Sequence, residues 1–160
     1  MPATDAVSPE RTPLKLAAFL PYRLNVAAAI VSDGLARIYS RRFGIGVPEW
    51  RVLATMGEFQ SITGKAIGLH SHMGKVKVSR AVASLEARGL IRRSPNEDDM
   101  REAFLVLTPE GARLYGEIAP LALAYVKRLE STLSPSELET LNAVLEKLMR
   151  RTQELDDPPA

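Results

Sequence analysis

The 160-residue chain contains no cysteine and only two histidines. The missing cysteine excludes disulfides, thiolate metal sites and cysteine nucleophiles. His70 and His72 stand two positions apart with no clear third ligand nearby, so we expect no metal site. The chain also lacks a phosphate-binding loop and a histidine paired with an acid at a recognisable spacing. We therefore expect no catalytic residues and no cofactor, and a protein that is not an enzyme.

Long hydrophobic runs are also absent. The longest apolar stretch, residues 26–31, is far too short to cross a bilayer. The first residues include Asp5 and Glu10 and show neither a basic segment nor a long apolar core, which argues against a signal peptide. We expect a cytoplasmic protein with no membrane partner.

Charge is nearly balanced overall, at a formal net value of +2, but it is unevenly distributed. Residues 61–101 carry eight Lys and Arg against four Asp and Glu, whereas residues 102–160 carry six against ten. This asymmetry suits a central module that contacts phosphates between flanks that do not. An ordinary solvated surface can show a difference of this size, so the charge pattern needs support from a motif.

The clearest motif is a basic amphipathic helix followed by a hairpin. Residues 75–88 read KVKVSRAVASLEAR, and Val78, Val82 and Leu85 recur at the spacing of one buried helical stripe. Gly89 ends this helix, and strands are expected at 91–93 and 103–107, around a turn at 94–99. A helix can enter the major groove of DNA, and an arginine at a hairpin tip can reach the adjacent minor groove.

Polar side chains on this helix are the candidate DNA contacts. Arg80 can donate two hydrogen bonds to guanine, which contributes about 1–3 kcal/mol of base discrimination. Lys75 and Lys77 can reach base edges or phosphates, and Ser79 and Ser84 can bond to phosphates. The alternative is an ordinary solvated helix face.

The hairpin supplies further candidates. We expect Arg101 to enter the minor groove and Asp99 to hold its guanidinium through a bidentate pair. The alternative is a surface ion pair of little energetic value. Of Arg92 and Arg93 at the hairpin base, we expect one, assigned as Arg92, to contact the DNA backbone and the other to be solvated.

Helices are expected on both sides of this module. The first covers residues 13–42, bent or divided at Pro21, and the next two cover 48–59 and 64–70, separated by a break at 61–64. Thr63 is the expected N-cap of the third helix. Two more helices follow at 109–133 and 134–155, the last opened by a capping box formed by Ser134 and Glu137.

The outer helices predict contact with a second subunit. The first helix is too long to bury its whole apolar stripe against its own domain. The last helix carries a narrow stripe of coiled-coil type, which is either simple core or, with the first helix, a dimer interface. That stripe contains Leu138, Leu141, Leu145 and Leu148.

These segments resemble the MarR family of bacterial transcription regulators over residues 14–155. The resemblance is carried by VPEWRVLATM, KVKVSRAVASLEARGLIRRSP, Asp99-Met100-Arg101 and LVLTPEG. It implies a mainly α fold in which a winged helix-turn-helix with a two-stranded β-wing is flanked by long dimerisation helices. It also implies a homodimer that binds a pseudo-palindromic operator in double-stranded DNA, commonly as a repressor, with an affinity that drops when a small aromatic or anionic molecule binds.

The resemblance also implies a division of the chain. We expect a flexible tail at 1–12, a dimerisation helix at 13–46, the DNA-binding domain at 47–108, C-terminal dimerisation helices at 109–155 and a tail at 156–160. Three positions depart from the family pattern. Gly74 replaces a polar N-cap, His72 replaces a turn glycine, and Met100 replaces a second basic residue in the wing.

An effector pocket is expected beside the first two long helices. Aromatic walls with an arginine suit an aromatic carboxylate, and the candidate residues are Tyr22, Arg23, Asn25, Trp50 and Arg51. The alternative places Trp50 in the core and leaves Arg23 as a surface charge. Two other functions stay open for the whole chain: a non-specific architectural DNA-binding protein and a winged-helix module that binds proteins.

Overall fold

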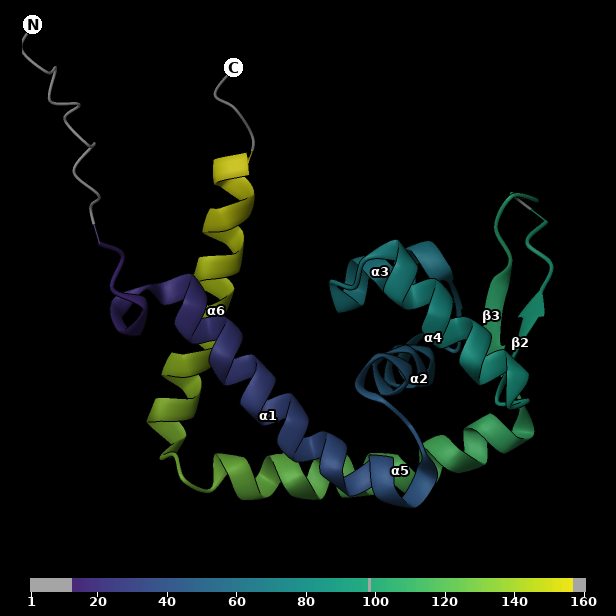
Figure 1. Cartoon of the computed structure of the whole chain (residues 1–160), viewed down its shortest axis with the longest axis horizontal. Coiled ribbons are helices and arrows are strands. Elements are labelled where there is room, and N and C mark those ends of the chain that lie inside the picture. Colours follow the sequence, from purple (N-terminus) through teal and green to yellow (C-terminus); the bar gives the residue numbers. More distant parts are fainter. Residues whose placement is uncertain (1–12, 98, 157–160) are drawn as a thin grey trace, which may run out of the picture.

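The computed structural model describes residues 13–97 and 99–156. Within these ranges the chain is mostly helical with one small antiparallel sheet, which agrees with the predicted fold class. A lobe of short elements is attached to a frame of long helices (Figure 1). The tails predicted at 1–12 and 156–160 lie outside the described residues, apart from Asp156, which ends the last helix.

The N-terminal helix begins later than predicted. A short 3-10 helix, η1 (Leu16–Ala18), precedes α1 (Leu20–Phe43), and Phe19 between them is extended. Pro21 lies in the first turn of α1. Because proline lacks the N–H that an interior position must donate, the long helix starts beside it instead of running through it. The predicted stop is confirmed at Gly44, which adopts a left-handed φ of 62°.

The lobe contains the predicted helix-turn-helix and wing. Its elements are α2 (Val47–Phe59), β1 (Ser61–Thr63), α3 (Gly64–Ser71), α4 (Lys75–Ala87), β2 (Ile91–Ser94) and β3 (Phe104–Leu107). Thr63 caps α3 as expected, because its hydroxyl oxygen accepts the Ala66 N–H at 3.2 Å. Helix α4 ends at Ala87 with Arg88 as its C-cap, and the following Gly89 has a φ of 68°.

The sheet has three strands, in the order β1-β3-β2, where two had been predicted. Strand β1 pairs antiparallel with β3, with Ile62 opposite Leu105. Both of these side chains are buried, so β1 closes one side of the lobe core. The segment had been interpreted as a break because three residues are too few to show the alternation of a strand.

One apolar core joins the lobe to the start of the next helix. Four residues of α4 are buried, and they pack with buried residues of α2, α3 and the sheet. The long helix α5 (Pro109–Glu130) starts at Thr108, whose hydroxyl oxygen accepts the Gly111 N–H at 3.0 Å and donates to the Gly89 carbonyl at 2.7 Å. Because Leu114 and Ile118 of α5 are also buried in this core, the frame holds the lobe at that point.

The outer helices leave apolar surface uncovered. The last helix, α6 (Pro135–Asp156), has no buried residue between 135 and 155, and α1 has a single one, Tyr39. Figure 1 shows α6 and the start of α1 far from the lobe. Large exposed apolar side chains on the frame include Leu20, Leu24, Ile30, Leu123, Val126, Leu141, Val144 and Met149. Within the described ranges, no helix is both long and apolar enough to cross a membrane.

Candidate nucleic-acid interface

The turn between α3 and α4 is held by backbone geometry. His72 adopts a left-handed φ of 50°, and the Met73 N–H donates to the Gly68 carbonyl at 3.2 Å. Met73 is buried and anchors the turn. Gly74 occupies the N-cap of α4 without a side-chain cap. Helix α4 therefore starts directly from a tight turn, as in a helix-turn-helix.

Helix α4 divides cleanly into a buried and an exposed side. Val78, Ala81, Val82 and Leu85 face the core. Val76, Arg80 and Ala83 lie on the opposite side and are exposed, and we call these three residues the outer face of α4. The predicted base-contacting residue, Arg80, is therefore free to meet a ligand that lies along the helix.

Val76 is a member of this face that the sequence interpretation missed. Its side chain is 63% exposed, which is high for a β-branched apolar residue on a helix of this lobe. The signal was present in the sequence, because Val76 and Arg80 stand four positions apart and share a helix face. An apolar side chain there can contact the methyl group of thymine.

The other predicted α4 residues flank the outer face. Ser79 is exposed and faces the wing, whereas Lys77 is exposed on the side that faces α1. Lys75, at the start of the helix, is exposed and borders both sides. Ser84 differs from expectation. It is half-buried, and its hydroxyl donates to the Glu49 carboxylate of α2. Because that hydroxyl already has a partner inside the protein, we remove Ser84 from the predicted phosphate contacts.

The wing separates its two basal arginines. Arg93 donates two hydrogen bonds to the Glu86 carboxylate of α4, at 2.9 and 3.0 Å, and so ties β2 to the helix. Arg92 is exposed and lies opposite Val106 in the strand register. Within the described part of the chain, Arg92 is therefore the member of the pair without such a tie to α4, and its contact with the DNA backbone stays a prediction.

The tip of the wing also departs from the expected contact. Asp99 Oδ1 accepts the backbone N–H of Arg101 at 3.0 Å, and the two side chains form no ion pair within residues 13–97 and 99–156. Asp99 thus shapes the turn, and the exposed Arg101 guanidinium is not held by this acid.

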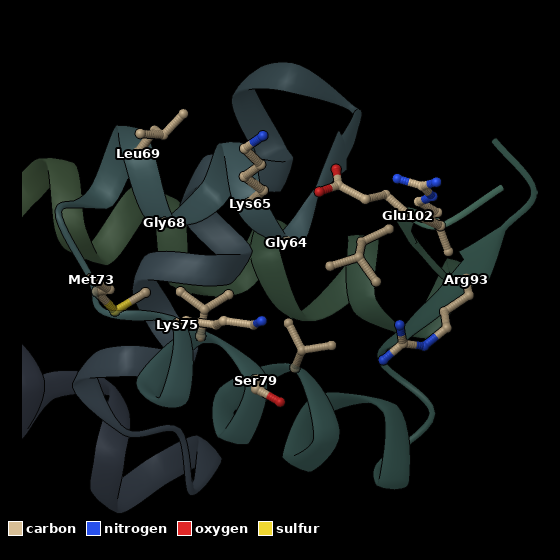
Figure 2. Close-up of a pocket in the computed structure, with 14 residues that line it drawn as sticks. Gly64, Lys65, Gly68, Leu69, Met73, Lys75, Ser79, Arg93 and Glu102 are labelled. Carbon is tan, nitrogen blue, oxygen red and sulfur yellow. The ribbon is translucent and has the colours of Figure 1, made fainter. Parts of the chain in front are cut away.

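A groove of about 690 Å³ lies between α3, α4 and the wing. Four cationic side chains line it against a single carboxylate, that of Glu102 (Figure 2). The cationic residues are Lys65, Lys75, Arg93 and Arg101. A concave surface with this excess of positive charge attracts a polyanion.

A second cavity, of about 760 Å³, lies between α1, α2 and the α3–α4 turn. Two of the five residues predicted for an effector pocket, Asn25 and Arg51, line it. Tyr22, Arg23 and Trp50 are not among its lining residues. Lys75 and Lys77 line it instead, and sequence spacing offered no sign that they would face α1.

Trp50 is half-buried and belongs to an aromatic cluster that packs against the core. Its ring centroid lies 5.6 Å from that of Tyr39 and 6.1 Å from that of Tyr115, which joins α2 to α1 and α5. Burial raises the pKa of the Tyr39 phenol, against the opposing effect of Arg51 and with a smaller contribution from Asp33. The alternative prediction, that Trp50 is part of the core, fits this geometry.

The histidines show no metal site. His70 packs against Phe59 with ring centroids 4.4 Å apart, and His72 is the left-handed residue of the turn. Within residues 13–97 and 99–156, no group of three or more His, Cys, Asp or Glu side chains is arranged to hold a metal ion.

Comparisons with known proteins agree with this architecture. Residues 43–102 match the sequence model described as the MarR family. The chain is 24% identical over 132 residues to the HTH-type transcriptional regulator YwoH of Bacillus subtilis, covering 82% of this chain and 95% of YwoH. It is 26% identical over 102 residues to the transcriptional regulator HosA of Escherichia coli, covering 64% of this chain and 76% of HosA.

Solved structures give the same result. The MarR family regulator Sco3205 of Streptomyces coelicolor, solved in complex with DNA, superposes with a TM-score of 0.74 at 25% identity, covering 94% of each chain. A mutant of Escherichia coli MarR, solved with operator DNA, gives a TM-score of 0.73 at 22% identity, covering 86% of this chain and 99% of that one. Residues 43–102 therefore match the MarR family, and the chain as a whole has the winged-helix fold of transcriptional regulators of that type.

Proposed function

We propose that this chain is a homodimeric, sequence-specific DNA-binding protein that represses transcription from a pseudo-palindromic operator and is released by a small aromatic or anionic molecule. The observation that carries the proposal is the juxtaposition of the outer face of α4 with the cationic groove beside it. A recognition helix needs an exposed polar side to reach base edges, and flanking cations bind phosphates.

Each exposed side chain then has a role in the complex. Arg80 reads a guanine and Val76 contacts a thymine methyl group in the major groove. Lys75, Lys77 and Ser79 bind phosphates around the helix. Arg92 contacts the backbone at the wing base, and Arg101 enters the minor groove from a turn shaped by Asp99.

The family comparisons support this placement of DNA. Both Sco3205 and the Escherichia coli MarR mutant were solved with DNA, and their folds match this chain over most of its length. The relatives are named as transcriptional regulators, which supports a regulatory protein rather than an enzyme. A regulator of transcription acts in the cytoplasm, where bacterial DNA lies.

The uncovered apolar surface of the frame supports the dimer. In a single chain, α1 and α6 expose large apolar side chains that a stable soluble protein covers with a partner. We assign residues 13–46 and 109–155 to dimerisation and residues 47–108 to DNA binding. A two-fold dimer presents two α4 helices to successive major grooves, about 10 base pairs apart.

The second cavity supports release by a ligand. It lies where α1, from the frame, meets the turn that starts α4. Arg51, Lys75 and Lys77 offer positive charge to a carboxylate there, and the α1 wall is apolar at Ala28 and Ala29. A ligand that binds more tightly when the lobe has moved relative to α1 shifts the population toward dimers in which the distance between the two α4 helices no longer matches the operator.

Selection from a pool of random duplexes at physiological salt tests the proposal. We expect enrichment of a palindrome whose half-sites lie about one helical turn apart, from a protein that sediments as a dimer. Binding without enrichment, together with a steep salt dependence, would identify an architectural DNA-binding protein. No binding at all would leave a protein-interaction module.

A further inference from the structure

The recognition helix is tied to the end of α1 by the Arg88 side chain. Arg88, at the C-cap of α4, donates to the Phe43 carbonyl at 2.8 Å and to the Gly44 carbonyl at 2.9 Å. These are the last residue of α1 and its cap. A guanidinium at a helix C-terminus is favourable because it meets carbonyls that have no partner within the helix and the negative end of the helix dipole.

A second link runs through Glu49 of α2. One oxygen of its carboxylate accepts the Gly46 N–H at 2.5 Å, in the junction between α1 and α2. The other oxygen accepts the Ser84 hydroxyl of α4. One half-buried carboxylate therefore holds both the junction and the recognition helix, and hydrogen bonds to an ionised group are stronger than neutral ones.

Both links attach to the C-terminal half of α4 and converge on residues 43–46. The groups that the proposed function assigns to DNA lie elsewhere, on the outer face and toward the helix start. Arg93 adds a third connection, but it joins α4 only to the wing of the same lobe. The Arg88 link joins α4 directly to the end of α1, and the Glu49 link joins α4 to the junction between α1 and α2.

We infer that Arg88 and Glu49 are positioning residues that fix the direction of the recognition helix relative to α1. The inference rests on the proposed function, in which α1 belongs to the dimerisation region and α4 enters the DNA. Fixing α4 against α1 sets the separation of the two recognition helices in a dimer. These residues determine which spacing between half-sites is accepted, while the outer face determines which bases are preferred.

Three variants and a control separate this role from folding. Arg88→Ala removes the first link, and Arg88→Lys keeps the charge but loses the planar fork that bonds two carbonyls at once. Ser84→Ala removes the second link and leaves the Glu49 contact with Gly46 intact. Alanine is the best helix former, so this variant is expected to fold even if Arg88→Ala does not. Arg113→Ala is the matched control, because Arg113 is an arginine whose partners, Glu110 and Glu117, share its own helix.

Affinity is measured for duplexes that carry the enriched half-sites at a series of spacings changed one base pair at a time. For Arg88→Ala and Ser84→Ala we expect discrimination between the best spacing and its neighbours to fall by roughly fivefold, within the range found for coupled residues. Base preference inside each half-site should stay unchanged in these variants. Arg88→Lys should discriminate between spacings less than wild type and more than Arg88→Ala, and Arg113→Ala should discriminate as well as wild type. A purely structural role would lower affinity at all spacings alike, and that result overturns the inference.

A measurement without DNA separates the inference from the proposed function. The chain has no native cysteine, so a spin label at Ala83→Cys reports one distance between the two recognition helices of a dimer. We expect a narrow distribution in the otherwise unchanged protein and a broader one when Arg88→Ala or Ser84→Ala is added. Equal widths would overturn the inference even if DNA binding is confirmed. Broadening in a dimer that binds no DNA would retain the positioning role and overturn the proposed function.

Discussion

At the scale of single residues, Arg80 has the clearest expected effect. It is exposed on α4 opposite the buried stripe, and we assign it to a guanine. Arg80→Ala should weaken operator binding by about 1–3 kcal/mol and relax the preference at one position in each half-site. Arg80→Lys should retain attraction to phosphates and lose most of the base preference, because lysine lacks the bidentate fork. Selection from random duplexes with each variant measures both effects. Unchanged preference in both variants would show that Arg80 does not face the bases.

Val76 allows a test at the level of one methyl group. Replacing the contacted thymine by uracil removes only the C5 methyl, which should cost wild type about 0.8 kcal/mol, the usual value for one buried carbon. Val76→Ala should bind the two duplexes almost equally, because its contact is already lost. Titrations of both proteins with both duplexes give the coupling energy directly. Equal sensitivity to uracil in the two proteins would remove Val76 from the interface.

Single residues were predicted well where a local pattern decides their place, and poorly where a distant partner does. The buried and exposed sides of α4 followed from helical spacing alone. Ser84 was misplaced because its partner, Glu49, lies on another helix. Trp50 faces Tyr39 and Tyr115 instead of the expected pocket for the same reason. Sequence spacing within one helix cannot identify which other helix will approach it.

At the scale of elements, the capping box of α6 makes a prediction that depends on pH. Ser134 N–H donates to the Glu137 carboxylate at 2.8 Å, and hydrogen bonds from the Ser134 backbone and side chain lower the pKa of Glu137. A carboxyl whose pKa is lowered by folding stabilises the folded state at pH values above the ordinary pKa of glutamate. This stabilisation is lost as the pH falls through the pKa of Glu137 in the folded protein.

Glu137→Ala should therefore lower the free energy of unfolding at neutral pH, and the difference from wild type should shrink as the solution is acidified. Denaturant unfolding over a series of pH values measures this difference. Glu139→Ala removes a carboxylate two residues further along the same helix. It serves as the control and should show no comparable pH dependence. A Glu137→Ala effect that stays constant on acidification would mean that the charge does not contribute through the cap.

Elements with strong end signals were predicted nearly to the residue. Helices α2, α3, α4 and α6 start at the expected proline, cap or turn positions. The start of α1 was wrong because an apolar pattern continues upstream of Pro21, whereas the missing proline N–H decides where the helix begins. Strand β1 was missed because its pairing with β3 depends on residues far away in the chain.

At the scale of the whole molecule, the second cavity links the lobe to the frame. Arg51 lines it, is exposed, and belongs to α2, outside the outer face of α4. If an anionic aromatic ligand binds there, Arg51→Ala should weaken ligand-induced release from the operator by about tenfold, the effect of losing a hydrogen bond to a charged group. Basal operator affinity should change little. Competition titrations with a set of aromatic carboxylates test this, and full release of the variant at wild-type ligand concentrations would place the effector elsewhere.

The proposed dimer gives a role to the long helices outside the lobe, and α6 provides its most direct test. Leu141 is 45% exposed in the single chain and lies on the apolar stripe of α6. Leu141→Glu places a charge in the proposed interface, where burial without a partner is strongly unfavourable. We expect a monomer in sedimentation and a loss of operator affinity on the order of 10²–10⁴-fold, because each lobe then binds one half-site without the gain of linkage. Ala143→Glu adds the same charge on the opposite side of α6 and should remain a dimer with normal affinity. If Leu141→Glu remains dimeric, the interface does not include this stripe, and α1 with α5 must supply it.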